Sequence, residues 1–222
     1  SVLDKEISSS PIEDERWPFI GLNQPLIDFY LGKRSDHEGR YIQDIWRFNR
    51  DQLEAEHNYI ALLFPTKDFG FFIWELIGRN LGDKAVGPVF TKETVAVFRS
   101  QTEVGQQLRR HMLKSLGLML DFYGFEYRKT GKTLSILPAQ TFDERRHVWL
   151  SEPNHNFLRL SRILESLRLA GLNKYAMALF RALEEINKSY ASVIGDSMDY
   201  WRNAVKEIES SGSSSPINST SP

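Results

Sequence analysis

The feature that most constrains the fold is a stripe of apolar residues that recurs at every fourth position in the middle of the chain. The stripe consists of Val104, Leu108, Met112, Leu116 and Leu120. An α-helix turns once in about 3.6 residues, so this spacing places the side chains on one face and predicts a helix over 101–123. Gly124 follows as a left-handed stop. Gly105 and Gly117 weaken the helix relative to alanine, so we expect a close helix contact at both.

The same periodicity recurs along most of the chain. Pro65 ends one such segment, because proline has no N–H group and disfavours helix in the residue before it. Only the region 125–137 carries a hairpin signal, with a Gly-containing turn between two β-branched or aromatic runs. The other predicted helical segments are 26–31, 40–50, 51–64, 91–98, 142–150, an αα-hairpin over 154–188 and a last helix from residue 196 or 197. The predicted fold class is mainly α, a single-domain helical bundle of about 7–9 helices with at most a short hairpin near 125–137.

The composition of the chain disfavours several classes of function. The 222 residues carry a formal net charge of -1, so the overall charge does not indicate a nucleic-acid partner. Cysteine is absent, which excludes disulfides and thiolate metal sites and suits an intracellular location. The longest mostly apolar run, residues 69–77, is far shorter than the roughly 18 residues of a membrane-spanning helix. We therefore expect no transmembrane segment.

Three segments differ from the helical body, which we expect to span residues 17–209. Residues 1–16 are polar and predict a flexible N-terminal segment, and residues 210–222 are serine-rich and predict a disordered tail. Residues 66–88 form an insertion that is too apolar for a solvated loop and too glycine-rich for a helix. A flap packed on the core, a lid over a pocket and an exposed patch for a partner are three interpretations of it. The candidate lid residues are Phe71, Phe72 and Trp74.

Polar residues near two helix ends form the candidate ligand site. One group lies in the predicted helical segment that stops before Pro65, and the other opens the helix that follows residue 153. In the first turns of this second helix, free N–H groups, the helix dipole and guanidinium groups favour a carboxylate or a phosphate. A boundary histidine, an N-cap cluster and internal ion pairs are the alternative interpretation of the same residues. The candidate ligand-binding residues are His57, Tyr59, Asn154, His155, Asn156, Arg159 and Arg162.

Motifs of common enzyme classes are absent from the sequence. It contains no H-E-x-x-H, G-x-S-x-G or G-x-x-x-x-G-K-[ST] pattern. No two histidines have the i, i+4 spacing of a helical metal site, so we expect no metal and no other cofactor. We assign no catalytic residue, and this favours a binding domain over an enzyme.

An ordered set of residues across the chain resembles one known family. The matching residues are Phe29-Tyr30-Leu31, Ile42, Trp46, His57, Tyr59-Ile60, Leu63-Phe64-Pro65, Phe90-Thr91, Val97-Phe98, Met119-Leu120-Asp121-Phe122-Tyr123-Gly124, His155-Asn156, Leu158-Arg159, Arg162-Ile163-Leu164, Leu167, Gly171-Leu172 and Asp199-Tyr200. No single piece is specific, but the order over residues 26–206 resembles the N-terminal domain of the opioid growth factor receptor family. Leu62 departs from the pattern, because a tryptophan is expected there, and the insertion is longer and more apolar than usual.

The resemblance implies an all-helical intracellular domain in the cytoplasm and/or nucleus that binds a short enkephalin-type peptide and acts in growth inhibition. Such a peptide needs an apolar slot, and its charged ends need a carboxylate and a cation. We therefore predict a ligand-binding domain that takes a short peptide, a small ligand or a protein partner in a helix-lined groove. The alternatives are an intracellular enzyme acting on a flexible apolar molecule in a lidded pocket, and a purely structural interaction module. The oligomeric state is left open.

Overall fold

The computed structural model describes residues 10–68, 87–152 and 154–212. These ranges hold ten helices and one antiparallel hairpin, so the predicted mainly α class with a short hairpin is confirmed. The helices are α2 (Gln24–Tyr30), α3 (Ile42–Ile45), α4 (Arg50–Ala55), α5 (Tyr59–Leu63), α7 (Lys92–Phe98), α8 (Glu103–Tyr123), α9 (Phe142–Trp149), α10 (Asn156–Leu169), α11 (Asn173–Ile194) and α12 (Ser197–Gly212). The strands are β1 (Phe125–Thr130) and β2 (Thr133–Pro138). Among the described helices, none is both long and apolar enough to cross a membrane.

Several helices begin at side-chain caps that the sequence signals. The side chains of Asn23, Asn49, Thr91 and Thr102 each accept a hydrogen bond from a backbone N–H group in the first turn of the helix that follows. The cap at the start of α7 is predictable from the sequence, because Thr91 stands directly before apolar residues at helical spacing and Glu93 follows in the first turn. Gly124 ends α8 with a φ of 87°, in the left-handed region that glycine tolerates, which is also as predicted.

The region 40–64 forms three short helices where the sequence predicts two longer ones. α3 stays short because Asn49 starts a new helix, in a capping box with Gln52. α4 then ends at Glu56, which has an extended backbone, and α5 ends just before Pro65. The break between α4 and α5 leaves carbonyl groups at the end of α4 that need partners from elsewhere in the fold.

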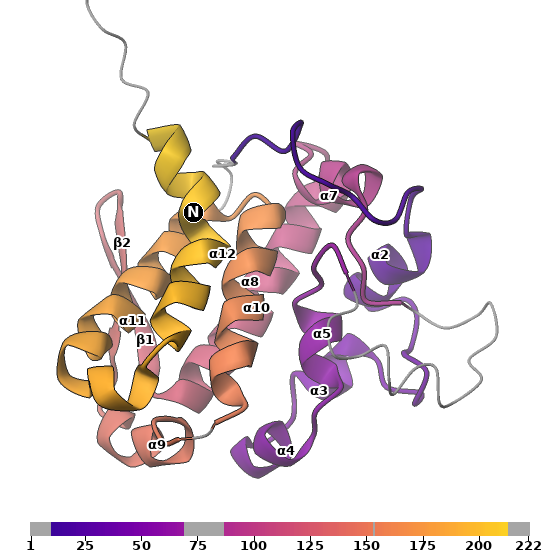
Figure 1. Cartoon of the computed structure of the whole chain (residues 1–222). Coiled ribbons are helices and arrows are strands. Elements are labelled where there is room, and N and C mark those ends of the chain that lie inside the picture. Colours follow the sequence, from indigo (N-terminus) through magenta and orange to yellow (C-terminus); the bar gives the residue numbers. More distant parts are fainter. Residues whose placement is uncertain (1–9, 69–86, 153, 213–222) are drawn as a thin grey trace, which may run out of the picture.

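The helices pack in layers around α8 and α10 (Figure 1). α10, α11 and α12 lie side by side on one side of the molecule, and the hairpin packs on α11 through β2 and on α8 through β1. α2 and α7 pack against α8 from the side of the N-terminal half. Apolar residues from nearly every element join in a single buried cluster. The described ranges therefore share one hydrophobic core.

Residues 10–23 run past α7 before α2 begins (Figure 1). The Arg168 guanidinium forms an ion pair with Glu15, with 2.5 Å between Nη1 and Oε1. Arg99 donates from Nη1 to the carbonyl oxygen of Ser10 at 2.8 Å. Burial, together with the nearby Arg168, lowers the pKa of Arg99 to about 10. Residues 1–9 and 213–222 lie outside the described ranges, and the predicted domain boundaries stay predictions.

The insertion enters and leaves the fold at one place. Thr66 and Val89 form an isolated parallel bridge, and the N–H group of Phe90 donates to the Thr66 carbonyl oxygen at 2.8 Å. The two ends of the insertion are therefore held together at the end of α5. The candidate lid residues Phe71, Phe72 and Trp74 lie outside the described residues, so the lid stays a prediction.

Candidate functional site

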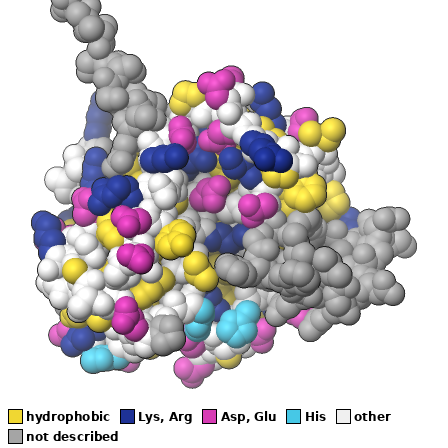
Figure 2. All heavy atoms as spheres, viewed as in Figure 1, with side chains coloured by type: hydrophobic (Ala, Val, Ile, Leu, Met, Phe, Trp, Pro, Cys, Tyr) yellow, Lys and Arg dark blue, Asp and Glu magenta, His cyan; other side chains and the backbone are white. Residues whose placement is uncertain are grey.

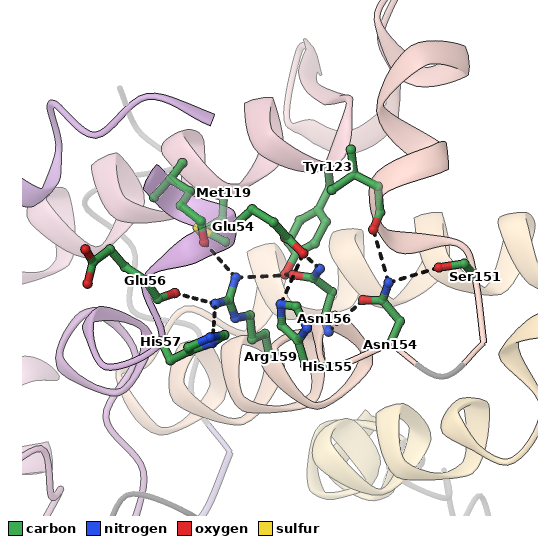
Figure 3. Close-up of polar contacts among 12 residues, drawn as sticks. Glu54, Glu56, His57, Met119, Tyr123, Ser151, Asn154, His155, Asn156 and Arg159 are labelled. Atoms are coloured by element: carbon green, nitrogen blue, oxygen red, sulfur yellow. Dashed lines mark hydrogen bonds and ion pairs between the residues drawn. The ribbon is translucent and has the colours of Figure 1, made fainter. Parts of the chain in front are cut away.

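The predicted polar residues meet where the first turn of α10 packs against the connection between α4 and α5 (Figure 3). We call this region the α10 junction. It consists of Glu54, His57, Tyr59, Asn154, His155, Asn156 and Arg159. The seventh predicted residue, Arg162, lies on the next turn of α10 and contacts the end of α5 instead. The structure thus brings together six of the seven predicted ligand-binding residues.

Arg159 is the centre of the α10 junction and is only 5% exposed. Its Nη1 donates to the Leu53 carbonyl oxygen at 2.8 Å, and its Nη2 donates to that of Glu56 at 2.6 Å. Its guanidinium also lies over the ring of Tyr59, 5.4 Å from the centroid. The two carbonyl groups belong to the end of α4, where no helical N–H group remains to bond them. Arg159 therefore caps α4, and these guanidinium N–H groups are bonded inside the protein.

Tyr59 and Asn156 extend this network to α8. The Tyr59 hydroxyl donates to the Leu53 carbonyl oxygen at 2.6 Å, and its burial raises the pKa of the phenol. Asn156 is fully buried, accepts a hydrogen bond from the Tyr123 hydroxyl at 3.4 Å and donates to Glu54 Oε2 at 3.2 Å. α4, α8 and α10 are therefore tied together through polar groups that bond one another.

His57 and His155 form the exposed part of the α10 junction together with the half-buried Glu54. The two imidazole rings are 5.5 Å apart and nearly perpendicular, and His155 Nε2 lies 3.4 Å from Glu54 Oε1. Partial burial lowers the pKa of His155, Arg159 and His57 lower it further, and Glu54 opposes them. Figure 2 shows histidine side chains near the lower edge of this face, close to the start of α10. A ligand at the junction would thus meet imidazole rings and a carboxylate.

Asn154 and Arg162 also direct their polar atoms at the main chain. Asn154 Oδ1 accepts from the N–H group of Asn156 at 2.9 Å, and its Nδ2 donates to the Val148 carbonyl oxygen at 3.1 Å. Arg162 Nε donates to the Phe64 carbonyl oxygen at 2.9 Å, and burial lowers the pKa of this arginine to about 10. Asn154 thus shapes the entry to α10, and Arg162 caps α5.

These contacts limit what the α10 junction does chemically. The predicted anion-binding donors are shared with carbonyl groups and with Glu54, so a carboxylate or phosphate ligand would compete with internal bonds. Within the described ranges, no group of three or more His, Asp or Glu residues is arranged to hold a metal ion. Ligand binding by these residues stays a prediction.

A pocket of about 500 Å³ between α4, α8 and α9 is a feature that the sequence did not predict. We call it the α9 pocket. Its lining residues are Phe48, Asn49, Arg50, Asp51, Leu53, Leu118, Asp121, Glu144 and Arg145. Leu53 connects it to the α10 junction, because its carbonyl group accepts the bond from Arg159. The volume is within the usual range for small-ligand sites.

The charges of the α9 pocket are only partly paired. Arg50 holds Asp121 through two hydrogen bonds of 3.1 and 3.2 Å. The local sequence pattern of the segment 142–150 predicts that Arg145 lies on the exposed side of the helix. In the structure Arg145 is buried and donates to the main chain of α8 at 2.8 Å, so this prediction is wrong. Its burial lowers its pKa, against the opposing charges of the pocket carboxylates. Asp51 and Glu144 are exposed, and neither has an ion-pair partner in the described part of the chain. Both carboxylates are therefore accessible to a cation from solvent.

The fold and these sites define a class, a small mainly α domain with polar sites at its helix ends. Its sequence matches the family described as opioid growth factor receptor (OGFr) conserved region over residues 23–211. The chain belongs to this family.

Curated relatives support the same assignment. The chain is 37% identical over 174 residues to the opioid growth factor receptor of Rattus norvegicus, covering 76% of the chain and 27% of that protein. It is 33% identical over 189 residues to the receptor of Homo sapiens, covering 82% and 25%. It is 30% identical over 150 residues to opioid growth factor receptor-like protein 1 of Mus musculus, covering 65% and 28%. The chain thus spans about a quarter of the length of these relatives. No solved structure matches it.

Proposed function

We propose that this domain binds a short peptide and that the α9 pocket takes the amino end of the peptide and an apolar side chain. The relatives carry the name opioid growth factor receptor, which describes a receptor for a growth factor. The observation that carries the proposal is the composition of the α9 pocket. Apolar groups of Phe48, Leu53 and Leu118 lie beside Asp51 and Glu144, which form no ion pair within the described part of the chain. A peptide site needs this combination of an apolar slot and a few charged groups.

The charge of the α9 pocket favours the amino end of a peptide. Its charged residues are Arg50, Arg145, Asp51, Asp121 and Glu144, which is one negative charge in excess. A free α-amino group is mostly protonated at pH 7 and forms strong hydrogen bonds with carboxylates. Asp51 and Glu144 are the two carboxylates available for it, since Asp121 is already held by Arg50.

The exposed part of the α10 junction extends the proposed site along α4. Asp51 in the pocket and Glu54 in the junction are three residues apart on this helix, and residues at that spacing share a face. An extended pentapeptide spans at most about 18 Å, which is enough to reach from one to the other. His57 and His155 would then contact an aromatic side chain of the peptide. Arg159 and Asn156 would hold α4 and α10 in place.

Calorimetric titration with an enkephalin-type pentapeptide tests the proposal. The peptide with a free amino end should bind, and its N-acetylated form should bind at least about tenfold more weakly because a charge-assisted hydrogen bond is lost. A double variant with Asp51→Asn and Glu144→Gln should lose affinity by a similar factor. Glu152→Gln removes an exposed carboxylate that does not line the pocket, and it should bind like the unchanged domain.

The result that contradicts the proposal is equal affinity for the free and acetylated peptides, or an equal loss in the Glu152→Gln control. A complete lack of binding would favour the structural interaction module. A double variant with His57→Ala and His155→Ala separates the two parts of the site, because it should weaken binding only if the peptide reaches the α10 junction. An intracellular location in the cytoplasm and/or nucleus belongs to the same proposal, and a fluorescent fusion expressed in cells tests it.

A further inference from the structure

A second pocket lies on the side of α8 that faces the hairpin. It has a volume of about 300 Å³ and is bordered by α8, β1 and the start of α11. We call it the basic pocket. Its lining residues are Arg110, Leu113, Lys114, Tyr127, Lys129 and Tyr175. It shares no lining residue with the α9 pocket.

Every charged residue that lines the basic pocket is a cation. Arg110 and Lys114 are four residues apart on α8, so their side chains leave the helix on the same face, and Lys129 comes from β1. All three are exposed. Within the described part of the chain, the side chain of Arg110 forms no hydrogen bond or ion pair, and the Lys114 ammonium lies over the Trp46 ring, 4.5 Å from its centroid. The concentrated positive charge attracts an anion.

The floor of the basic pocket is apolar and aromatic. Tyr175 is 3% exposed, and its ring is perpendicular to that of Tyr127 with 6.0 Å between the centroids. The half-buried Leu113 completes the wall on α8. Gly117 lies one turn further along α8, and a Cβ atom there would be 4.0 Å from the Tyr127 ring, so no α8 side chain crowds that ring from this position. The pocket therefore combines a cationic rim with a surface suited to a flat ring.

We propose that the basic pocket binds the side chain of a phosphotyrosine in a partner peptide. A phosphate monoester carries a charge of about -1.5 to -2 at pH 7 and three strong acceptor oxygens, which suit one guanidinium and two ammonium groups. The phenyl ring beneath the phosphate packs against Leu113 and Tyr127. A volume of about 300 Å³ is at the lower end for ligand sites, so it suits one side chain better than a whole nucleotide. This site would make binding of a partner depend on the phosphorylation of that partner.

Fluorescence anisotropy with labelled acidic peptides tests the proposal. One peptide carries a single phosphotyrosine, a second has the same sequence without the phosphate, and a third carries phosphoserine at that position. The phosphotyrosine peptide should bind at least about tenfold more tightly than either of the others, because it alone offers both the phosphate and the ring. Lys129→Glu and Arg110→Glu should each reduce its affinity by at least about tenfold, since each substitution reverses a charge at the rim.

Arg128→Glu is the matched control for Lys129→Glu. Arg128 is the neighbouring residue of β1, is exposed, does not line the pocket and lies 3.8 Å from Glu126, so the same charge change is made on the opposite face of the strand. It should bind the phosphotyrosine peptide within about twofold of the unchanged domain. An equal loss in Arg128→Glu, or equal binding of the phosphorylated and unphosphorylated peptides, overturns the proposal. So does tighter binding of vesicles that contain phosphoinositides.

The double variant with Asp51→Asn and Glu144→Gln separates this inference from the proposed function. It changes the α9 pocket and leaves the basic pocket intact, so its affinity for the phosphotyrosine peptide should stay the same. If both activities fall together in it, the basic pocket is not an independent site.

Discussion

The α10 junction and the basic pocket both contain an arginine on a long helix, but the two arginines are used in opposite ways. Arg159 is buried, and its guanidinium donates to two carbonyl groups of α4. Arg110 is exposed, and its side chain has no polar partner within the described ranges. The first charge completes the fold, whereas the second remains for a ligand. In this chain, the role of an arginine is therefore decided by its partner and not by its helix or its position.

The use of Arg159 recurs through the interior. Five arginines donate to carbonyl groups at or beside the C-terminal end of another helix. They are Arg99 at α10, Arg109 at α7, Arg145 at α8, Arg159 at α4 and Arg162 at α5. The C-terminal end of a helix has unbonded carbonyl groups and a partial negative charge, so a guanidinium satisfies both. The helices of this fold are therefore joined by arginine caps as well as by apolar packing.

Removal of Arg159 should give the largest effect. Arg159→Met keeps much of the apolar side chain but leaves the Glu56 carbonyl group without its partner and the Leu53 carbonyl group with the Tyr59 hydroxyl alone. We expect the free energy of unfolding to fall by about 3 kcal/mol, because each of the two lost hydrogen bonds from the charged guanidinium contributes about 1.5–3 kcal/mol. Urea denaturation followed by circular dichroism measures it.

Arg110→Met is the matched control, since it makes the same chemical change on an exposed helix face. It should alter the free energy of unfolding by less than about 0.5 kcal/mol. A similar loss in both variants would mean that the contrast between the two arginines does not exist.

The difference between these two arginines explains which features of the structure could be predicted from the sequence. Caps such as Thr91 and stops such as Gly124 were predictable, because each depends on residues within one turn. The bonds of Arg159 were not, because Leu53 lies 106 residues away in sequence. Spacing placed His155 and Arg159 on one helix face, but it says nothing about which groups face them. The sequence therefore left both the anion site and the internal cluster as interpretations.

The α9 pocket was missed for a related reason. Its lining combines residues near the start of α4 with Leu118 on α8 and Glu144 on α9. The local sequence around each of these residues is typical of an ordinary helix surface or core. Arg145 was assigned to the exposed face of α9, because nothing in the local pattern shows that the end of α8 lies against it. Pockets made by distant segments need the tertiary arrangement.

Two glycines of α8, Gly105 and Gly117, differ in the space around them. Close contacts were expected at both, but only Gly105 has one, since a Cβ atom there would lie 2.4 Å from the Ser100 carbonyl oxygen. Gly105→Ala should lower stability by about 1–2 kcal/mol, because the overpacking exceeds the gain in helix propensity. Gly117→Ala, whose nearest neighbour would be Tyr127 at 4.0 Å, should raise stability by up to about 1 kcal/mol. Thermal unfolding of both variants gives the two signs, and equal signs would contradict the difference in space.

The titration of His155 should give the smallest effect. Its pKa is lowered in the folded protein, so between that value and the ordinary value of 6.5 the unfolded chain binds more protons than the folded one. Stability should therefore fall slightly as the pH is lowered from 7.5 to 6.0, by a few tenths of a kcal/mol, because the side chain is 44% exposed. Urea denaturation at both pH values shows it, and His155→Gln should reduce the difference.

The same histidine reports directly on the contrast between the two arginines. Arg159 is one cause of the lowered pKa of His155, whereas Arg110 is not among the causes. In Arg159→Met the pKa of His155, followed by NMR of its ring protons, should rise toward 6.5, while in Arg110→Met it should stay unchanged. An unchanged pKa in Arg159→Met would show that burial alone sets it and that the Arg159 charge is screened at the junction. A rise in that variant alone would show that the buried charge acts on the exposed part of the proposed peptide site.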